Sequence, residues 1–332
     1  MDAPTALEHP EGRVVVQELG SGLKRVTVEL FDPTAYVSER EFQTAYPLEL
    51  IEVILELRGP AMLGYSIRRA EEPAHLTEPL PHYTLAYVPE ADLDGKRLLD
   101  FGCGSGSSTV ALARLFPRTH IVAVDLEEGN ISVARLRAAH DGVGNATFLV
   151  SPGPLDLPGD IGTFDFVFLS AVYEHLLPAE RPVLMAELWR QLRPGGILFL
   201  NQTPHRYYPL EYHTTGLPLL NYLPERAALP MARRLSRRVR ADRTWEELLR
   251  AGVRGATEGE IMRDLEGAGE GRPSLLRPSG LGLRDQVDVW YSLSMSQRPR
   301  RLKRAVQVVF KAASRMTGSS FVPTLALAIR KD

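Results

Sequence analysis

An acidic residue and three closely spaced glycines occupy residues 98–106 (LLDFGCGSG), directly after an apolar segment. Glycine has no Cβ and tolerates positive φ, so a loop of this kind lets the backbone pass close to a ligand. A dinucleotide fingerprint has the spacing G-x-G-x-x-G. Read from Gly102, that spacing requires a glycine at position 107, where Ser107 stands. A P-loop is excluded as well, because no Gly-Lys-Ser or Gly-Lys-Thr follows the loop.

A second acidic residue ends the next apolar segment. Asp125 closes residues 121–125 and follows Gly102 by 23 residues, close to the separation of about 20 residues expected in a nucleoside-binding βαβ unit. Ribose hydroxyls are hydrogen-bond donors, and a carboxylate held at the end of a strand can accept from two of them. The spacing therefore favours Asp125 as a ribose ligand, with Glu127 as the weaker alternative.

The glycine run, as D-x-G-x-G-x-G, resembles motif I of the class I S-adenosylmethionine-dependent methyltransferases. Residues 164–176 (FDFVFLSAVYEHL) resemble motif IV and the helix after it, and residues 192–196 (LRPGG) resemble the turn before strand five. One element departs from the family pattern. Many relatives have Gly-Asp-Ala after strand three, whereas residues 151–156 read SPGPLD, which leaves the adenine contact open. The resemblance covers residues 96–202 closely and the end of the chain loosely.

The resemblance implies S-adenosylmethionine as the cofactor. Asp100 is expected to bind the methionine ammonium, directly or through water, and Leu126 to lie against the adenine face. Backbone N–H groups at the start of the following helix suit the methionine carboxylate. Cys103, the single cysteine of the chain, is expected to be a small filler of the loop rather than a nucleophile. The expected cofactor-binding residues are Asp100, Gly102, Cys103, Gly104, Gly106, Asp125, Leu126 and Ser170.

Methyl transfer is an in-line displacement, so the protein mainly aligns the reacting atoms, and a hydroxyl acceptor also needs a base. Ligands of such sheets lie beyond the carboxyl ends of the strands. His175 follows strand four, and support of the loop is the alternative role for it. His205 follows strand five and is the first choice of base, before His213 and Glu211, although this aromatic-rich segment could instead be a packed lid. No compact metal-binding motif is present. His205, Glu211 and His213 could converge on a metal ion, but their spacing does not require it, and no metal-binding residue is predicted.

The elements that must position these residues alternate in the order of an α/β fold. From residue 96, short apolar strands are separated by amphipathic helices, which predicts βαβ units with right-handed crossovers. The expected fold is a Rossmann-like, doubly wound, mostly parallel sheet of the class I methyltransferase type. The strands are expected at 97–101, 120–125, 146–150, 164–170 and 197–201, and the helices at 107–115, 127–140 and 182–192.

Further segments flank this core. The N-terminal extension is expected to contain a β-hairpin over 13–31 and a helix over 46–58 that stops at Gly59-Pro60. A basic helix at 301–315 and an antiparallel strand at 322–330 are expected near the end of the chain. Four domains are predicted: the extension (1–92), the cofactor-binding core (93–202), a substrate-cap insertion after strand five (203–285) and C-terminal strands that complete the sheet (286–332). The alternation of strands and helices is expected to resume at residues 286–293.

Composition and charge restrict the class of protein. The hydrophobic and charged fractions, 44% and 24%, are ordinary for a globular protein, and one cysteine excludes an internal disulfide. The N-terminus does not resemble a signal peptide and no apolar run is long enough to span a bilayer, so a cytoplasmic location is expected.

The net charge of −2 is unevenly distributed, being −12 over residues 1–204 and +10 over residues 205–332. The basic stretches at 233–240 and 298–311 could contact an anionic membrane surface. For the second stretch, packing of its apolar stripe on the sheet is favoured. Nucleic-acid binding is not expected, because no recognised RNA-binding module accompanies the charge.

These features together predict a methyltransferase that acts on oxygen in a small molecule, a sugar or a lipid-linked glycan. Two alternatives stay open. One is an N- or C-methyltransferase of the same fold. The other is a SAM-binding sensor or partner protein without catalysis.

Overall fold

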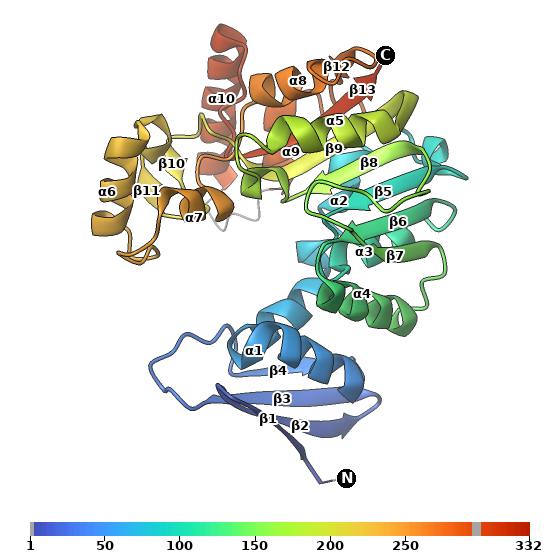
Figure 1. The fold of residues 1–332 in the computed structure, drawn as a ribbon, viewed down its shortest axis with the longest axis vertical. Coiled ribbons are helices and arrows are strands. Elements are labelled where there is room, and N and C mark those ends of the chain that lie inside the picture. The colour runs from blue at the N-terminus through green and yellow to red at the C-terminus, as the bar shows by residue number, and fades with distance from the viewer. Residues whose placement is uncertain (1–2, 294–299) are drawn as a thin grey trace. The chain divides into compact units, whose positions relative to one another are not determined.

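The computed structural model describes residues 3–293 and 300–332. Its chain divides into two compact units, which are described separately (Figure 1). The first unit comprises the chain up to residue 80 together with residues 103–150. The second comprises residues 81–102 and 151–332.

A four-stranded antiparallel sheet with the order β1-β2-β3-β4 opens the first unit. The predicted hairpin is confirmed, since β2 and β3 pair from Gly12↔Leu30 to Gly20↔Leu23. Alternate valines, among them Val14 and Val26, are buried on one face of this sheet, as expected when only one face packs on a core. The strands are β1 (Thr5–His9), β2 (Gly12–Gly20), β3 (Leu23–Leu30) and β4 (Glu41–Thr44).

Helix α1 (Leu48–Glu71) packs on that apolar face, with Leu50, Ile51 and Ile54 in the same buried cluster as the valines. The predicted stop at Gly59-Pro60 is a kink instead of an end. Gly59 adopts φ 70° and ψ 165°, and the helix resumes beyond Pro60. Proline is tolerated there because it stands in the first turn of the resumed helix, where its missing N–H costs no bond.

The remainder of the first unit has the predicted βαβ order. Helix α3 (Ser107–Leu115) precedes β6 (His120–Asp125), and α4 (Glu128–His140) links β6 to β7 (Ala146–Val150). Strands β6 and β7 are parallel, from Ile121↔Ala146 to Asp125↔Val150.

The second unit holds the strands in the order β12-β13-β9-β8-β5. The pairings β5·β8 and β8·β9 are parallel, and β13 is antiparallel to β9, which confirms a mostly parallel α/β sheet closed by an antiparallel strand. Helix α5 (Arg181–Gln191) links β8 to β9. These strands are β5 (Arg97–Phe101), β8 (Phe164–Ser170), β9 (Leu192–Pro204), β12 (Pro273–Leu275) and β13 (Thr324–Lys331).

Between β9 and β12 the chain forms a small cluster of its own, drawn in yellow and orange in Figure 1. Its buried side chains come from helices on either side of residue 240, and Leu220, Ala232 and Leu248 are its centre. The elements of this cluster are β10 (Leu210–Glu211), β11 (Leu217–Pro218), α6 (Glu225–Leu235) and α7 (Trp245–Arg250). Helix α8 (Glu258–Glu266) follows them and contacts α5 instead.

The end of the chain differs from expectation in two ways. The segment Gln286–Leu293 is a helix, α9, and the outer strand is β12, which lies before residue 286. A three-residue edge strand that begins with proline carries no alternating pattern, so the sequence did not reveal it. Helix α10 (Arg300–Thr317) contacts α9, where the Phe310 and Trp290 rings lie 5.1 Å apart.

The prediction that α10 packs its apolar stripe on the sheet is wrong. Leu302, Val308, Val309 and Met316 are all at least half exposed. Among the helices that the structure describes, none combines the length and apolar composition needed to cross a bilayer.

Candidate functional site

The glycine loop between β5 and α3 turns through three residues in the left-handed region. Gly102, Gly104 and Gly106 have φ of 72°, 55° and 77°, which other residues adopt only with strain. A Cβ on Gly106 would lie 2.5 Å from Cβ of Ala134 in α4. Glycine is therefore required at Gly106 for two reasons, its backbone conformation and the close approach of α4.

The loop begins beside the segment that follows β8. A Cβ on Gly102 would lie 2.5 Å from Cγ2 of Val172, and Phe101 pairs with Leu169 at the carboxyl ends of two parallel strands. Ligands of open α/β sheets bind at this edge. The residues that directly follow Val172 thus stand next to the start of the loop.

Asp125 ties the loop to the end of β6. Its Oδ2 accepts from the Gly104 N–H (2.8 Å), and its Oδ1 accepts from the Glu127 N–H (3.1 Å) and Asn130 Nδ2 (2.9 Å). A carboxylate has about four acceptor positions, so about one is left for a ribose hydroxyl in this conformation. Leu126 is half exposed beside it and offers an apolar surface to a flat base.

Arg137 of α4 is a supporting residue that the sequence analysis missed. It is buried, and its Nη1 donates to the Ser105 carbonyl (2.7 Å) and to Ser107 Oγ (2.8 Å). Its Nη2 donates to the Ser66 carbonyl in α1 (3.0 Å). The signal was available, because Arg137 follows the buried Ala134 by three residues and so shares its helix face.

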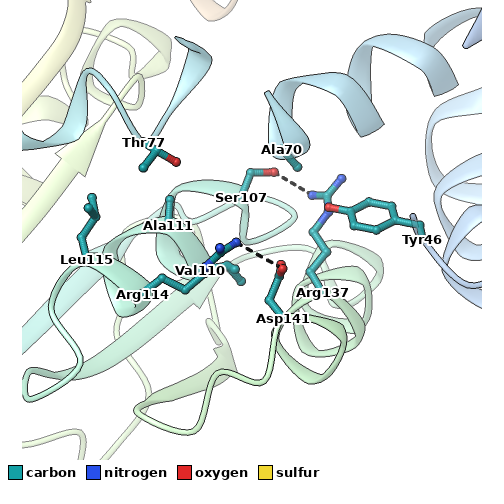
Figure 2. Close-up of a pocket in the computed structure, with 10 residues that line it drawn as sticks. All are labelled: Tyr46, Ala70, Thr77, Ser107, Val110, Ala111, Arg114, Leu115, Arg137 and Asp141. Atoms are coloured by element: carbon teal, nitrogen blue, oxygen red, sulfur yellow. Dashed lines mark hydrogen bonds and ion pairs between the residues drawn. The ribbon is translucent and has the colours of Figure 1, made fainter. Parts of the chain in front are cut away.

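The hollow beside Arg137 is too small to be the cofactor site. Its volume is about 220 Å³, below the roughly 300–1,000 Å³ of ligand pockets, and no loop glycine lines it. Figure 2 shows Arg137 reaching Ser107 on one side, with Arg114 paired to Asp141 nearby.

The second unit contains all four proposed bases, and two of them meet. The His175 and His213 ring centroids lie 5.7 Å apart. Glu174, which the sequence analysis did not select, is fully buried beside them. One ligand atom from each of Glu174, His175 and His213 lies within 4.8 Å of the others. These three residues are called the Glu-His-His cluster below.

Each member of the cluster is held by its neighbours. Glu174 Oε2 accepts from Thr203 Oγ1 at 2.8 Å, and burial raises the pKa of the Glu174 carboxyl. His175 Nδ1 lies 2.7 Å from the Arg250 carbonyl. Burial first, and then the neighbouring His175, lower the pKa of His213.

Glu211 and His205 lie outside the cluster. Glu211 Oε1 accepts from the backbone N–H groups of His213 (3.1 Å) and Thr214 (3.0 Å), and its Oε2 accepts from the N–H of Thr215 (2.5 Å). This carboxylate shapes the turn that carries His213. His205 is 1% exposed, and burial lowers its pKa to about 4.

For three of the predicted cofactor-binding residues, the structure shows burial or a hydrogen bond within the protein. Asp100 and Cys103 are buried, and burial of the thiol is consistent with the filler role. Ser170 Oγ donates to Asn201 Oδ1 at 2.7 Å. Their contacts with a cofactor stay predictions. The positive-φ glycines, the close approach at Gly106 and the carboxylate at the end of β6 fit S-adenosylmethionine.

Comparison with known proteins shows what the central part of the chain is similar to. Residues 98–196 match the model of a methyltransferase domain. The chain is 36% identical over 141 residues to the ubiquinone biosynthesis O-methyltransferase of Nitrosococcus oceani, covering 41% of this chain and 56% of that protein. It is 33% identical over 145 residues to the fatty-acid O-methyltransferase of Mycolicibacterium smegmatis, covering 44% and 50%.

Among solved structures, an O-methyltransferase family protein from Burkholderia thailandensis matches with a TM-score of 0.43 at 15% identity, covering 70% of this chain and 60% of that one. The chain spans about half the length of the curated relatives it matches. The matched residues contain the glycine loop, Asp125 and the strands that carry them. Residues 98–196 therefore form a methyltransferase domain of the S-adenosylmethionine-dependent type, and the similarity supports S-adenosylmethionine as the cofactor.

Proposed function

We propose that this protein transfers the methyl group of S-adenosylmethionine to an oxygen atom of a small molecule, with sugars and lipid-linked glycans among the first acceptors to test. Similarity to a ubiquinone biosynthesis O-methyltransferase and a fatty-acid O-methyltransferase supports oxygen as the acceptor atom. The aromatic and basic residues of the 203–285 segment support this segment as the region that binds the acceptor.

The Glu-His-His cluster is the observation that carries this proposal. It follows Val172, which contacts the start of the glycine loop at the carboxyl edge of the sheet. S-adenosylmethionine supplies an electrophilic methyl group, so the chain must align the acceptor oxygen and handle its proton. A carbonyl can only accept, so His175 Nδ1 donates to Arg250 and the lone pair of the neutral ring is on Nε2. That nitrogen is a suitable proton acceptor.

We favour this cluster over the other two candidates for chemical reasons. The hydrogen bonds from the 213–215 turn already satisfy Glu211. His205 is buried, and a base whose pKa is near 4 is poorly matched to work at neutral pH. His175 and His213 are both accessible to solvent.

The experiment is methyl transfer from labelled S-adenosylmethionine to a panel of phenols, carboxylic acids, sugars and lipid-linked glycans, with identification of the methylated atom. We expect an O-methyl product, and we expect His175→Ala to lower kcat about 10²–10⁴-fold without changing calorimetric affinity for S-adenosylmethionine. His120→Ala, at an exposed position in the first unit, is the control.

Three results would contradict the proposal. Methylation at nitrogen or carbon would favour the other reaction class. Cofactor binding with no transfer to any acceptor would favour a sensor or partner protein. Absence of cofactor binding would remove the cofactor role of the glycine loop.

We also propose that α10 contacts an anionic lipid surface. Its exposed Val308, Val309 and Met316 lie beside the exposed Arg304 and Arg315, a combination typical of helices that lie in the membrane interface. Vesicles of phosphatidylcholine with phosphatidylglycerol should bind the protein, and pure phosphatidylcholine should bind it much less. Equal binding to both, or unchanged binding of Val308→Asp, would refute this contact.

A further inference from the structure

We infer that Glu174, His175 and His213 together bind one divalent transition-metal ion. Each offers one ligand atom, and these atoms lie within 4.8 Å of one another. The residues come from two segments far apart in the chain, the short helix η3 (Tyr173–His175) and the turn after β10. The sequence had predicted no metal-binding residue, and had left His205, Glu211 and His213 as the set that could converge on a metal.

The Glu174 carboxylate is the first independent indication of a ligand. Its side chain is fully buried, and Oε2 accepts from Thr203 Oγ1. The other oxygen, Oε1, is buried and has no hydrogen-bond partner among the residues that the structure describes. A buried polar atom without a partner costs about 1–3 kcal/mol, and more when it is charged. Oε1 lies 3.9 Å from His175 Nε2, so it points into the cluster.

The His175 ring is oriented as a metal ligand requires. Its Nδ1 donates to the Arg250 carbonyl at 2.7 Å, which leaves the lone pair of the neutral ring on Nε2. Metal-ligating histidines almost always donate their second ring nitrogen to a carbonyl or carboxylate in this manner. Thr203 plays the corresponding part for Glu174, since it holds Oε2 and leaves Oε1 directed at the cluster.

His213 completes the set because Gly252 leaves room for its ring. A Cβ on Gly252 would lie 2.8 Å from His213 Nε2 and 3.3 Å from Glu174 Cγ, and the φ of Gly252 is +89°. The turn that carries His213 is held by the Glu211 carboxylate. The histidine thus approaches from a fixed backbone, and only its side chain must move when an ion binds.

Two imidazoles and one carboxylate form a ligand set that suits zinc and its first-row neighbours. Ligand distances near 2.1 Å in tetrahedral geometry place ligand atoms about 3.4 Å apart. The 3.9 Å between Glu174 Oε1 and His175 Nε2 needs only a small contraction, whereas the whole set, whose atoms lie within 4.8 Å, needs a larger one that the partly exposed histidine rings can make. Three protein ligands leave a fourth position open, as in catalytic rather than structural zinc sites.

The role of the ion rests on the proposed function, whereas its binding does not. An oxygen at the open position would lose its proton more readily, because a bound divalent ion lowers the pKa of a coordinated hydroxyl. The histidine lone pairs would then hold the ion, and the proton of the acceptor would pass to water. In the metal-free protein the same nitrogens are free to accept that proton.

The test is zinc titration of the full chain after chelator treatment, with a competing zinc indicator and, separately, cobalt absorption spectroscopy. We expect one ion per chain. Affinity should fall on the order of 100-fold or more in His213→Ala and in Glu174→Gln, the latter keeping the shape of the side chain and its bond to Thr203. His120→Ala is the matched control, and circular dichroism establishes that each variant is folded.

Saturable binding that both cluster variants lose would support the site. No binding above that of a non-specific protein, or equal affinity in His213→Ala and His120→Ala, would overturn it. Methyl transfer that is unaffected by chelation would overturn the role of the ion in the reaction. Zinc binding without methyl transfer to any acceptor would contradict the proposed function and leave the metal site established.

Discussion

His205 allows a quantitative test of a buried neutral histidine. Its imidazole is 1% exposed, its Nδ1 lies 3.2 Å from the Val322 carbonyl, and Nε2 has no hydrogen-bond partner among the described residues. Burial lowers its pKa from 6.5 to about 4, against smaller opposing effects of the Val322 carbonyl and Glu260. The ring is therefore neutral in the folded protein at neutral pH.

The sign of the pH effect follows from proton uptake. Between about pH 4 and 6.5 the unfolded chain protonates this histidine and the folded chain does not. The contribution to stability is thus fully present above pH 6.5 and is lost as the pH falls toward 4. At 1.36 kcal/mol for each pKa unit, the total is about 3 kcal/mol, of which about 2 kcal/mol is lost between pH 7 and pH 5.

The perturbation is His205→Gln, studied by urea unfolding at pH 7 and pH 5 with tryptophan fluorescence. Other buried groups act in the opposite direction, because burial raises the pKa of Glu258 and Asp264. The informative quantity is therefore the difference in unfolding free energy between wild type and variant. We expect this difference to shrink by about 2 kcal/mol at pH 5.

Two outcomes would contradict the conclusion that His205 is a buried neutral histidine. If the cost of His205→Gln is the same at both pH values, His205 is not a buried neutral group and the reasoning is refuted. His120→Gln, at an exposed position, is the control, and the same pH effect in that variant would also count against a specific role of burial.

Three further predictions concern the cofactor loop. Gly106→Ala should weaken S-adenosylmethionine binding at least about tenfold in calorimetry, because its Cβ would meet Ala134 at 2.5 Å; Gly142→Ala, which shares the positive φ but has no atom within 4 Å, should leave binding intact. Asp125→Asn should weaken binding about 10–100-fold, since the carboxylate ties the loop and is expected to accept from a ribose hydroxyl; unchanged affinity would remove it from the site. Arg137→Met should lower the unfolding free energy by about 2–4 kcal/mol, and an unchanged urea midpoint would show that its four donated hydrogen bonds contribute little.

The regular elements of the core could be predicted from the sequence because their signals are local. The bounds of β5, β6, β7 and β8 agree with those expected from apolar runs and flanking turn residues. The glycine loop was also predictable, since positive φ at Gly102, Gly104 and Gly106 is a property of the residues themselves. These local signals were sufficient to indicate the α/β class and the methyltransferase domain.

Tertiary structure decided which polar residues act together. Glu174 had no signal of its own, and its importance comes from full burial beside His213, which the chain brings back after β9 and β10. Glu211 was a candidate base behind His205 in the sequence, and the structure shows that the turn at 213–215 satisfies its carboxylate. Burial and long-range neighbours set the desolvation of a side chain, and a one-dimensional pattern does not contain them.

The same reasoning applies to the surface of the molecule. Amphipathic periodicity in residues 301–315 correctly predicted a helix, but it could not say whether the apolar face would meet the sheet or solvent. That outcome depends on which surfaces remain uncovered after the rest of the chain has packed. The sequence alone therefore determined the glycine loop, the core strands and the methyltransferase domain. Packing alone determined the Glu-His-His cluster, the role of Arg137 and the exposed face of α10, because each of these depends on contacts between residues distant in the chain.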